Sequence, residues 1–416
     1  MKPKPTHSRF QTPTLSALAA APQLGSEQCA SATTALMPIC ARPSAVMVRG
    51  AGSYLWDDSG KRYLDFIQGW AVNCLGHCPP EVSDTLASQS SQLITPSPAL
   101  HNAPQLALAQ ALTENSPFAQ VHFANSGAEA NEAAIKLARK WGQVERGGAA
   151  EIITTHNAFH GRTLATMAAS GKPGWSSMYP PMPAGFKKAE FGSIEQLTAQ
   201  ITAKTVAIML EPIQGEAGVV MPPDGYMRAV RALADANGIL LILDEVQTGL
   251  GRTGALYAHH HHGIVPDIMT LGKGIGAGVP LSAVLAAPAA CRFEVGNQGG
   301  TYNGNPLMCA VGHRVLQIVQ KPEFLRHVRE REVELRDGLE RLKQSHSLVA
   351  VRGQGLLYAV KLAEPRAAEI CDAAFANGLL INPAQPDILR FMPSLRVTAG
   401  EIADMLTLLD DILTSR

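Results

Sequence analysis

The sequence predicts an α/β fold in which a large domain with a mostly parallel sheet precedes a smaller α+β domain. Two observations lead to this prediction. Between about residues 80 and 300, short apolar runs alternate with stretches of helical spacing, as expected for a parallel sheet covered by helices. After Pro306 this alternation stops, and a charged helical stretch, two short apolar runs and an amphipathic tail follow. The chain therefore contains two structural units of different kinds.

Four segments are predicted from these changes along the chain. The first is rich in Ser, Thr, Ala and Pro and is expected to be a disordered leader. The second contributes strands to the smaller domain, the third is the large domain, and the fourth is the remainder of the smaller domain. Their bounds are residues 1–35, 36–75, 76–305 and 306–416.

Three short strands are predicted in the second segment, at residues 46–50, 53–56 and 62–66. The residues between the last two strands, Asp57-Asp58-Ser59-Gly60, are turn formers that separate apolar stretches. This pattern predicts a β-hairpin.

Five predicted strands of the large domain end in polar residues. The strands are residues 121–123, 152–155, 206–210, 239–243 and 267–271. The polar groups that follow them lie in Asn125–Gly127, His156–Arg162, Glu211, Asp244 and Lys273. In open α/β sheets, ligands bind beyond the carboxyl ends of the strands, so a functional site is expected at this edge.

The fourth segment is predicted to combine helices with two strands. Residues 330–343 are charged and helical, and residues 349–353 and 356–360 have the composition of strands. Apolar residues of the tail recur at the spacing of one helix face, which predicts an amphipathic helix. They are Ile402, Met405, Leu406, Leu409, Ile412 and Leu413.

The composition is that of a globular protein, with 416 residues, 46% hydrophobic and 17% charged. Lys+Arg and Asp+Glu both number 35, so no basic excess favours nucleic acid or an anionic membrane. No apolar run approaches the ~18 residues of a membrane helix. Seven scattered cysteines form no disulfide framework, which favours a reducing cytoplasm.

No metal site is predicted. Cys74-Leu-Gly-His-Cys78 has no second Cys/His pair at the spacing that zinc sites use. The run His259–His262 is expected to be a solvated helix end.

Lys273 and Asp244 suggest covalent chemistry. Lys273 lies among glycines, in Gly272-Lys-Gly-Ile-Gly-Ala-Gly278, and an amine that forms and breaks a Schiff base needs open backbone around it. Asp244 ends an apolar run, where a carboxylate would pair with a cationic ring nitrogen. Together they indicate an aldehyde cofactor, although a lysine in a glycine-rich turn is by itself usually a surface residue. A metal-binding Asp-Glu pair of a phosphate-loop protein is excluded, because no G-x-x-x-x-G-K-[ST] motif is present.

Two further segments have the composition of a ligand site. Ser126 and Glu129 have the spacing of a capping box, so a helix should begin there, and its N-terminus beside Gly127 is a natural phosphate site or an ordinary cap. Phe159 could stack on a flat ring and Arg162 could bind a carboxylate, although a structural loop is equally consistent.

Six motifs occur in one order between about Met37 and the C-terminus. They are Asn125-Ser-Gly-Ala-Glu-Ala-Asn131, Phe159-His-Gly-Arg-Thr163, Glu211-Pro-Ile-Gln-Gly-Glu216, Asp244-Glu-Val-Gln247, Gly272-Lys-Gly274, and Gly300-Thr301 with Gly304-Asn-Pro306. In these residues the chain resembles the class III pyridoxal-phosphate aminotransferases, and within them it is most similar to the acetylornithine and ornithine aminotransferases. The resemblance implies a homodimer with fold type I of the pyridoxal-phosphate enzymes, the aspartate-aminotransferase-like fold.

The resemblance also implies which residues bind pyridoxal 5'-phosphate. Lys273 would hold it as a Schiff base and move the proton, while Asp244 would pair with the pyridine nitrogen. Gln247 would contact the ring oxygen and Phe159 would stack on the ring. The remaining cofactor-binding residues would be Ser126, Gly127, Ala128 and Val246, with Thr301 reaching in from the neighbouring subunit.

Three charged residues are assigned to the substrates by the same resemblance. Arg162 would hold the distal carboxylate of the amino donor. Arg390 would hold the α-carboxylate of glutamate, and Glu216 would mask it while the other substrate binds. The implied reaction is a ping-pong transfer of an amino group from N-acetylornithine, or a related ω-amino or diamino acid, to 2-oxoglutarate.

Two positions depart from the acetylornithine aminotransferase pattern. Cys40 stands where these enzymes usually have a tyrosine that helps to bind the distal carboxylate, and Gly300 replaces the usual serine. Ornithine, 4-aminobutyrate, a succinyl-diaminopimelate precursor and a secondary-metabolite amine therefore stay open as donors. An aminomutase or epimerase of the same fold is the alternative reaction. A cofactor-sensing regulator is the non-enzymatic alternative, and it would need a DNA-binding domain.

Overall fold

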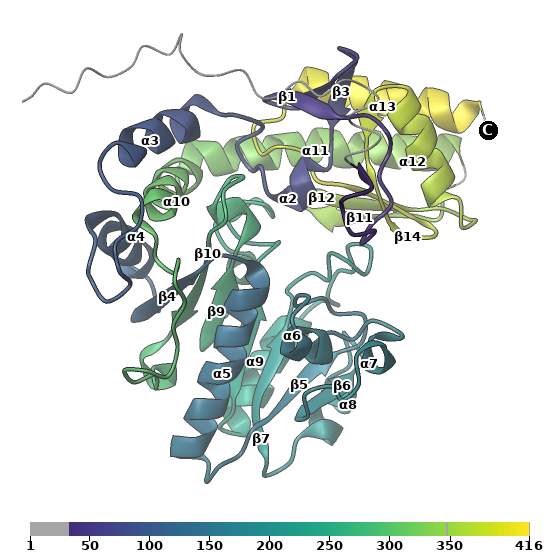
Figure 1. The fold of residues 1–416 in the computed structure, drawn as a ribbon. Coiled ribbons are helices and arrows are strands. Elements are labelled where there is room, and N and C mark those ends of the chain that lie inside the picture. Colours follow the sequence, from purple (N-terminus) through teal and green to yellow (C-terminus); the bar gives the residue numbers. More distant parts are fainter. Residues whose placement is uncertain (1–32, 347, 416) are drawn as a thin grey trace, which may run out of the picture.

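The computed structural model describes residues 33–346 and 348–415, so nearly all of the predicted leader lies outside the described residues. Figure 1 shows two parts. The lower part contains a seven-stranded sheet with helices against it, and the upper part contains two four-stranded sheets with long helices. The predicted fold class, a large α/β unit with a smaller sheet-containing unit, is confirmed. The exact segment bounds stay a prediction.

The seven-stranded sheet is largely parallel, as predicted, and has the strand order β4-β10-β9-β8-β7-β5-β6. Its strands are β4 Gln120–Ala124, β5 Glu151–Thr155, β6 Phe186–Ala189, β7 Thr205–Leu210, β8 Leu240–Asp244, β9 Ile268–Leu271 and β10 Ser282–Ala286. Strand β10 runs antiparallel to both of its neighbours, while β9, β8, β7, β5 and β6 are mutually parallel. The parallel strands therefore end at one edge of the sheet.

Helices cover both faces of this sheet, whereas α11, α12 and α13 pack against the smaller sheets. The α-helices of the described residues are α2 Gln68–Ala71, α3 Pro80–Ser90, α4 Ala103–Thr113, α5 Gly127–Glu145, α6 Leu164–Ala169, α7 Trp175–Met178, α8 Ile194–Gln200, α9 Tyr226–Ala236, α10 Pro306–Val319, α11 Pro322–Ser345, α12 Ala367–Ala376 and α13 Ala399–Thr414. Ile152 and Ile242 belong to the apolar core under α5, whereas their neighbours Ile153 and Leu241 belong to the core under α9. Burial on both faces explains why these strands read as continuous apolar runs.

Helix α5 begins where the capping box predicted. The Ser126 hydroxyl accepts the N–H of Glu129, and the Glu129 carboxylate accepts the backbone N–H of Ser126. The helix is 19 residues long and ends before Gly147 and Gly148, which form the turn into β5. Its predicted inner face packs against the sheet, with Trp141 partly buried at the margin.

The N-terminal strands pair with the C-terminal part of the chain. Strands β1 Met47–Ala51, β2 Tyr54–Asp57 and β3 Arg62–Asp65 form an antiparallel ribbon, which confirms the predicted hairpin. Strand β3 also pairs in parallel with β13 Leu379–Leu380. The other small sheet has the order β11-β12-β15-β14. Its strands are β11 Ala350–Gln354, β12 Leu357–Lys361, β14 Asn382–Gln385 and β15 Ile388–Phe391.

The histidine run differs from the prediction of a solvated helix end. His259 is buried, and its Nδ1 lies 2.8 Å from Glu245 Oε1. The Glu245 carboxylate also accepts the backbone N–H groups of Ala258 and His259, because a buried carboxylate needs several donors. Only His260 and His261 of the run are exposed. Among the described residues, no helix is both long and apolar enough to cross a membrane.

Candidate active site

A cavity of about 220 Å³ lies where β5, β7, β8 and β9 end. It is lined by Gly127, Ala128, Asn131, Phe159, His160, Gly161, Arg162, Glu211, Glu216, Asp244, Val246, Gln247 and Lys273. Most of the residues predicted from the strand ends therefore meet in one place. A larger hollow of about 610 Å³ lies beyond α6 and contains none of these residues.

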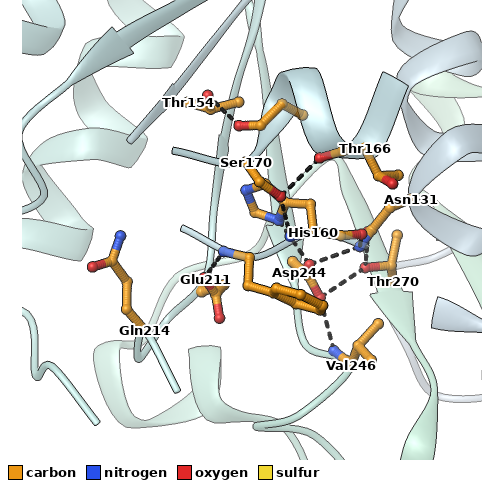
Figure 2. A network of polar contacts seen from close by, with 12 residues as sticks. Asn131, Thr154, His160, Thr166, Ser170, Glu211, Gln214, Asp244, Val246 and Thr270 are labelled. Carbon is orange, nitrogen blue, oxygen red and sulfur yellow. Dashed lines mark hydrogen bonds and ion pairs between the residues drawn. The ribbon is translucent and has the colours of Figure 1, made fainter. Parts of the chain in front are cut away.

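Asp244 is held by donors on both carboxylate oxygens (Figure 2). Its Oδ2 accepts hydrogen bonds from Asn131 Nδ2 at 2.7 Å and from His160 Nδ1 at 2.8 Å, and its Oδ1 accepts the Val246 N–H at 3.0 Å. The Thr270 hydroxyl donates to Asn131 Oδ1 at 2.8 Å and so fixes the amide in turn. Asp244 is only 4% exposed. These contacts fix the orientation of its carboxylate toward the cavity.

Lys273 follows β9 with a backbone φ of 44°, which is uncommon for a residue other than glycine. Burial lowers the pKa of the Lys273 ammonium from its ordinary value, and the negative charge of Glu216 acts in the opposite direction. A lowered pKa increases the fraction of free amine near neutral pH. A free amine is the form that attacks a carbonyl group.

Glu211 is buried directly after β7 and lines the cavity. Its Oε1 accepts the Phe159 N–H at 2.9 Å, and its Oε2 accepts the Gly215 N–H at 3.4 Å. Burial, and then the charge of Asp244, raise the pKa of Glu211 to about 8. This carboxyl group therefore keeps its proton at neutral pH.

The partly buried Glu216 forms an ion pair with the buried Arg390. Arg390 Nη2 lies 2.8 Å from Glu216 Oε1, and the Arg390 side chain is fully buried. Asn382 Oδ1 accepts bonds from Arg390 Nε and Nη2, and Gly215 O accepts one from Nη1. Burial raises the pKa of Glu216, but the charges of Arg390 and Lys273 outweigh it, so the net pKa is lowered. The carboxylate therefore covers the guanidinium in this structure.

Aromatic and cationic side chains gather around Phe159 and Arg162 of the cavity wall. The rings of Phe159 and Trp175 meet edge to face, with centroids 5.8 Å apart. The Arg162 guanidinium lies 4.6 Å from the centroid of the Trp175 ring and is exposed. Lys172 Nζ lies 5.0 Å from the centroid of the Phe159 ring. The two cations beside Phe159 suit an anionic group.

The cavity fits the pyridoxal phosphate that the resemblance implies. A Cβ on Gly127 would lie 2.7 Å from Val246 Cγ1, so only glycine lets the α5 N-terminus approach this closely. The first N–H groups of a helix have no partner within the helix, and they suit a phosphate group. Gln247 is 7% exposed, and neither polar atom of its amide has a hydrogen-bond partner among the described residues. A ring oxygen beside Gln247 would satisfy such a buried amide.

Some predicted site residues do not line this cavity. Cys40, Gly300 and Thr301 are exposed, and none of them belongs to the cavity wall. Their roles toward substrate, or toward the site of a neighbouring subunit, stay predictions. Ser126 caps α5 at the edge of the site, and Arg390 reaches the cavity through Glu216.

The sequence did not assign a role to four residues of the site. Asn131 and His160 lie within motifs that had been recognised, and Glu211 had been recognised as a strand end. Thr270 lies inside an apolar run, where a single hydroxyl gives no local signal. Only the fold shows that these side chains surround Asp244 or face it across the cavity.

Comparison with known proteins identifies the family. The family model of the class-III aminotransferases matches residues 39–413. The chain is 54% identical over 384 residues to acetylornithine aminotransferase 2 of Bordetella pertussis, covering 92% of this chain and 97% of the relative. It is 51% identical to the acetylornithine aminotransferase of Ralstonia nicotianae over 385 residues, which cover 91% of this chain and 96% of that one.

Two solved structures have the same fold. The ornithine aminotransferase from Toxoplasma gondii ME49 superposes with a TM-score of 0.89 at 30% identity, covering 94% of this chain and 96% of that one. The N-acetylornithine aminotransferase from Stenotrophomonas maltophilia K279a superposes with a TM-score of 0.81 at 36% identity, covering 92% and 98%. The family model and the relatives together show that the chain belongs to the class III aminotransferases and is a pyridoxal-phosphate-dependent transaminase.

Proposed function

We propose that the chain transfers the δ-amino group of N-acetylornithine to 2-oxoglutarate and forms glutamate. Relatives that are 54% and 51% identical carry the name acetylornithine aminotransferase. The observation that carries the proposal is the ion pair between Glu216 and Arg390 beside Lys273. A reaction with two different substrates needs a carboxylate-binding arginine that can be covered for one and exposed for the other.

The cofactor and the side chains of the cavity carry out different parts of the reaction. Pyridoxal phosphate, when bound, supplies an aldehyde for the incoming amine and a ring that withdraws electrons from the carbon that loses its proton. Lys273 lines the cavity. Its free amine accepts that proton and then delivers it to a different carbon atom. Asp244, oriented by Asn131 and His160, would pair with the ring nitrogen. The N-terminal N–H groups of α5 would hold the phosphate.

The substrates are held by the two arginines. In the first half-reaction Arg162 binds the carboxylate of N-acetylornithine, while Glu216 stays on Arg390. In the second half-reaction the α-carboxylate of 2-oxoglutarate replaces Glu216 on Arg390. The reaction is ping-pong because the amino group stays on the enzyme between the two substrates.

The proposal includes a homodimer in the cytoplasm. Thr301 and Gly300 lie on an exposed loop outside the cavity of their own chain, which suits residues that complete a neighbouring site. Size measurement of the purified protein by light scattering should give twice the mass of one chain.

The test follows labelled nitrogen. N-acetylornithine carrying ¹⁵N at the δ position is incubated with the cofactor-loaded enzyme and 2-oxoglutarate, and glutamate is analysed by mass spectrometry. Labelled glutamate is the expected product, and the Lys273→Ala variant should give none. Label that stays in a rearranged donor without 2-oxoglutarate would instead show an aminomutase. Absence of any labelled product contradicts the proposal, and ornithine, 4-aminobutyrate and succinyl-diaminopimelate then serve as competing donors in the same assay.

A further inference from the structure

The Glu216 carboxylate lies between two cations. Its Oε1 is 2.8 Å from Arg390 Nη2, and its Oε2 is 3.8 Å from Lys172 Nζ. The two cations therefore approach different oxygens of the same group. Lys172 and Glu216 have side chains that are 23% and 21% exposed, whereas Arg390 is at 0%.

Opening Arg390 to a substrate requires Glu216 to leave it. The Nε and one N–H of Nη2 are already directed at Asn382, and Nη1 donates to Gly215 O. A substrate carboxylate that binds both Nη1 and Nη2 must therefore take the position of Glu216 Oε1. A carboxylate that loses its partner in a largely buried place is strongly destabilised, so the displaced Glu216 needs another cation.

Lys172 is placed to supply that cation. It lies on the loop after α6 (Leu164–Ala169), and its ammonium rests against the rings of Phe159 and Trp175, at 5.0 and 5.6 Å from their centroids. Cation–π contacts of this kind are not strongly directional, so they leave the ammonium able to move toward Glu216. Lys172 also lines the larger hollow of about 610 Å³, which gives its side chain room.

We infer that Lys172 is a specificity-determining residue: it receives Glu216 when the 2-oxo acid binds Arg390, and so lowers the cost of opening the site for the second substrate. The inference rests on the proposed function, because it needs a substrate carboxylate on Arg390. The inference predicts that Lys172 affects the two substrates differently. Lys172 should matter for dicarboxylates that displace Glu216 and should matter little for an amino donor that leaves Glu216 in place.

The experiment compares Lys172→Gln, Lys172→Arg and a matched control, Lys187→Gln. Lys187 is 27% exposed and pairs with Glu151 at 2.9 Å, outside the cavity wall. Binding of glutarate, an unreactive dicarboxylate, to the cofactor-loaded enzyme is measured by calorimetry. The two half-reactions are followed separately by absorbance in single turnovers, one with N-acetylornithine and one with 2-oxoglutarate. Thermal melting confirms that each variant is folded.

Lys172→Gln should weaken glutarate binding by about fivefold, as expected for the loss of one partly exposed ion pair. The kcat/KM for 2-oxoglutarate should fall by a similar factor, and that for N-acetylornithine should change by less than about twofold. Lys172→Arg should restore both values, and Lys187→Gln should leave them unchanged. The inference is overturned if kcat/KM falls equally for both substrates, or if the affinity for glutarate is unchanged. If the wild type shows no exchange with 2-oxoglutarate, the proposed function fails, and the glutarate comparison still decides the role of Lys172.

Discussion

Glu211 gives the strongest prediction of pH-dependent stability. Its carboxyl group is buried after β7, and burial together with Asp244 raises its pKa to about 8, from an ordinary value of 4.5. The folded state therefore keeps a proton that the unfolded chain has already lost over this pH range. Folding stability must then fall as the pH rises from 4.5 to about 8, and the contribution is lost fully above that.

The magnitude follows from the two pKa values. At about 1.4 kcal/mol per pH unit, the free energy of unfolding should decrease by about 5 kcal/mol across this range because of Glu211 alone. Glu211→Gln cannot ionise and removes this decrease. Its amide oxygen can still accept the Phe159 N–H. Its NH₂ group cannot accept the Gly215 N–H, and the lost hydrogen bond lowers the free energy of unfolding by about 1 kcal/mol. The variant should thus be close to the wild type in stability at pH 5 and more stable at pH 8.

The assay is thermal unfolding of cofactor-free wild type and Glu211→Gln at one protein concentration, from pH 5 to pH 9. For a chain of 416 residues, 1 kcal/mol corresponds to about 1 °C in Tm. We expect the variant to melt within about 1 °C of the wild type at pH 5 and about 4 °C higher at pH 8. Parallel pH profiles for the two proteins would refute the reasoning, since they would show that Glu211 is ionised throughout.

Three other changes test the site. Lys273→Ala should abolish single-turnover amine exchange in the absorbance assay, because no other lysine of the described residues lies on the cavity wall; residual exchange at the wild-type rate would exclude it as the proton carrier. Gly127→Ala places a Cβ 2.7 Å from Val246 Cγ1 and should weaken pyridoxal phosphate binding by about tenfold or more in a fluorescence titration, whereas unchanged affinity would move the phosphate elsewhere. Cys40→Tyr should raise kcat/KM for N-acetylornithine by about threefold or more, since a phenol donates a better hydrogen bond than a thiol; no change would mean that the distal carboxylate is held by other groups.

Much of the fold could be predicted because its signals are local. The capping box at Ser126 sets the start of α5, and the apolar runs that become β5, β7, β8 and β9 are buried on both faces. Strands β6 and β10 gave weaker signals. Phe186–Ala189 contains two lysines at the sheet edge, and Ser282–Ala286 is rich in alanine, so neither reads as a strongly apolar run. The antiparallel direction of β10 depends on the path of the chain, which no local pattern fixes.

The site residues, too, could be predicted only where their signals are local in the sequence. The sequence indicated Lys273 and Asp244 because strand ends and glycine-rich turns are visible along the chain. The contact of Asn131 with Asp244 joins residues 113 positions apart, and only the sheet order brings them together. His259 was predicted wrongly because its buried partner, Glu245, lies 14 residues away. In each case the missing information is a tertiary contact, which residue composition does not contain.

Helix α5 has a consequence for attaching reporters to this enzyme. It starts beside the cavity at Gly127, and at 19 residues it is about 28 Å long, so the Gly147–Gly148 turn lies that far from the site. Both glycines have positive φ, and a side chain at either would meet no neighbouring atom within 4 Å. A short peptide tag or a fluorophore-bearing insertion at this turn would therefore project into solvent at the opposite end of the sheet. Immobilisation through that turn would leave the exposed Arg162 at the cavity free to meet substrate.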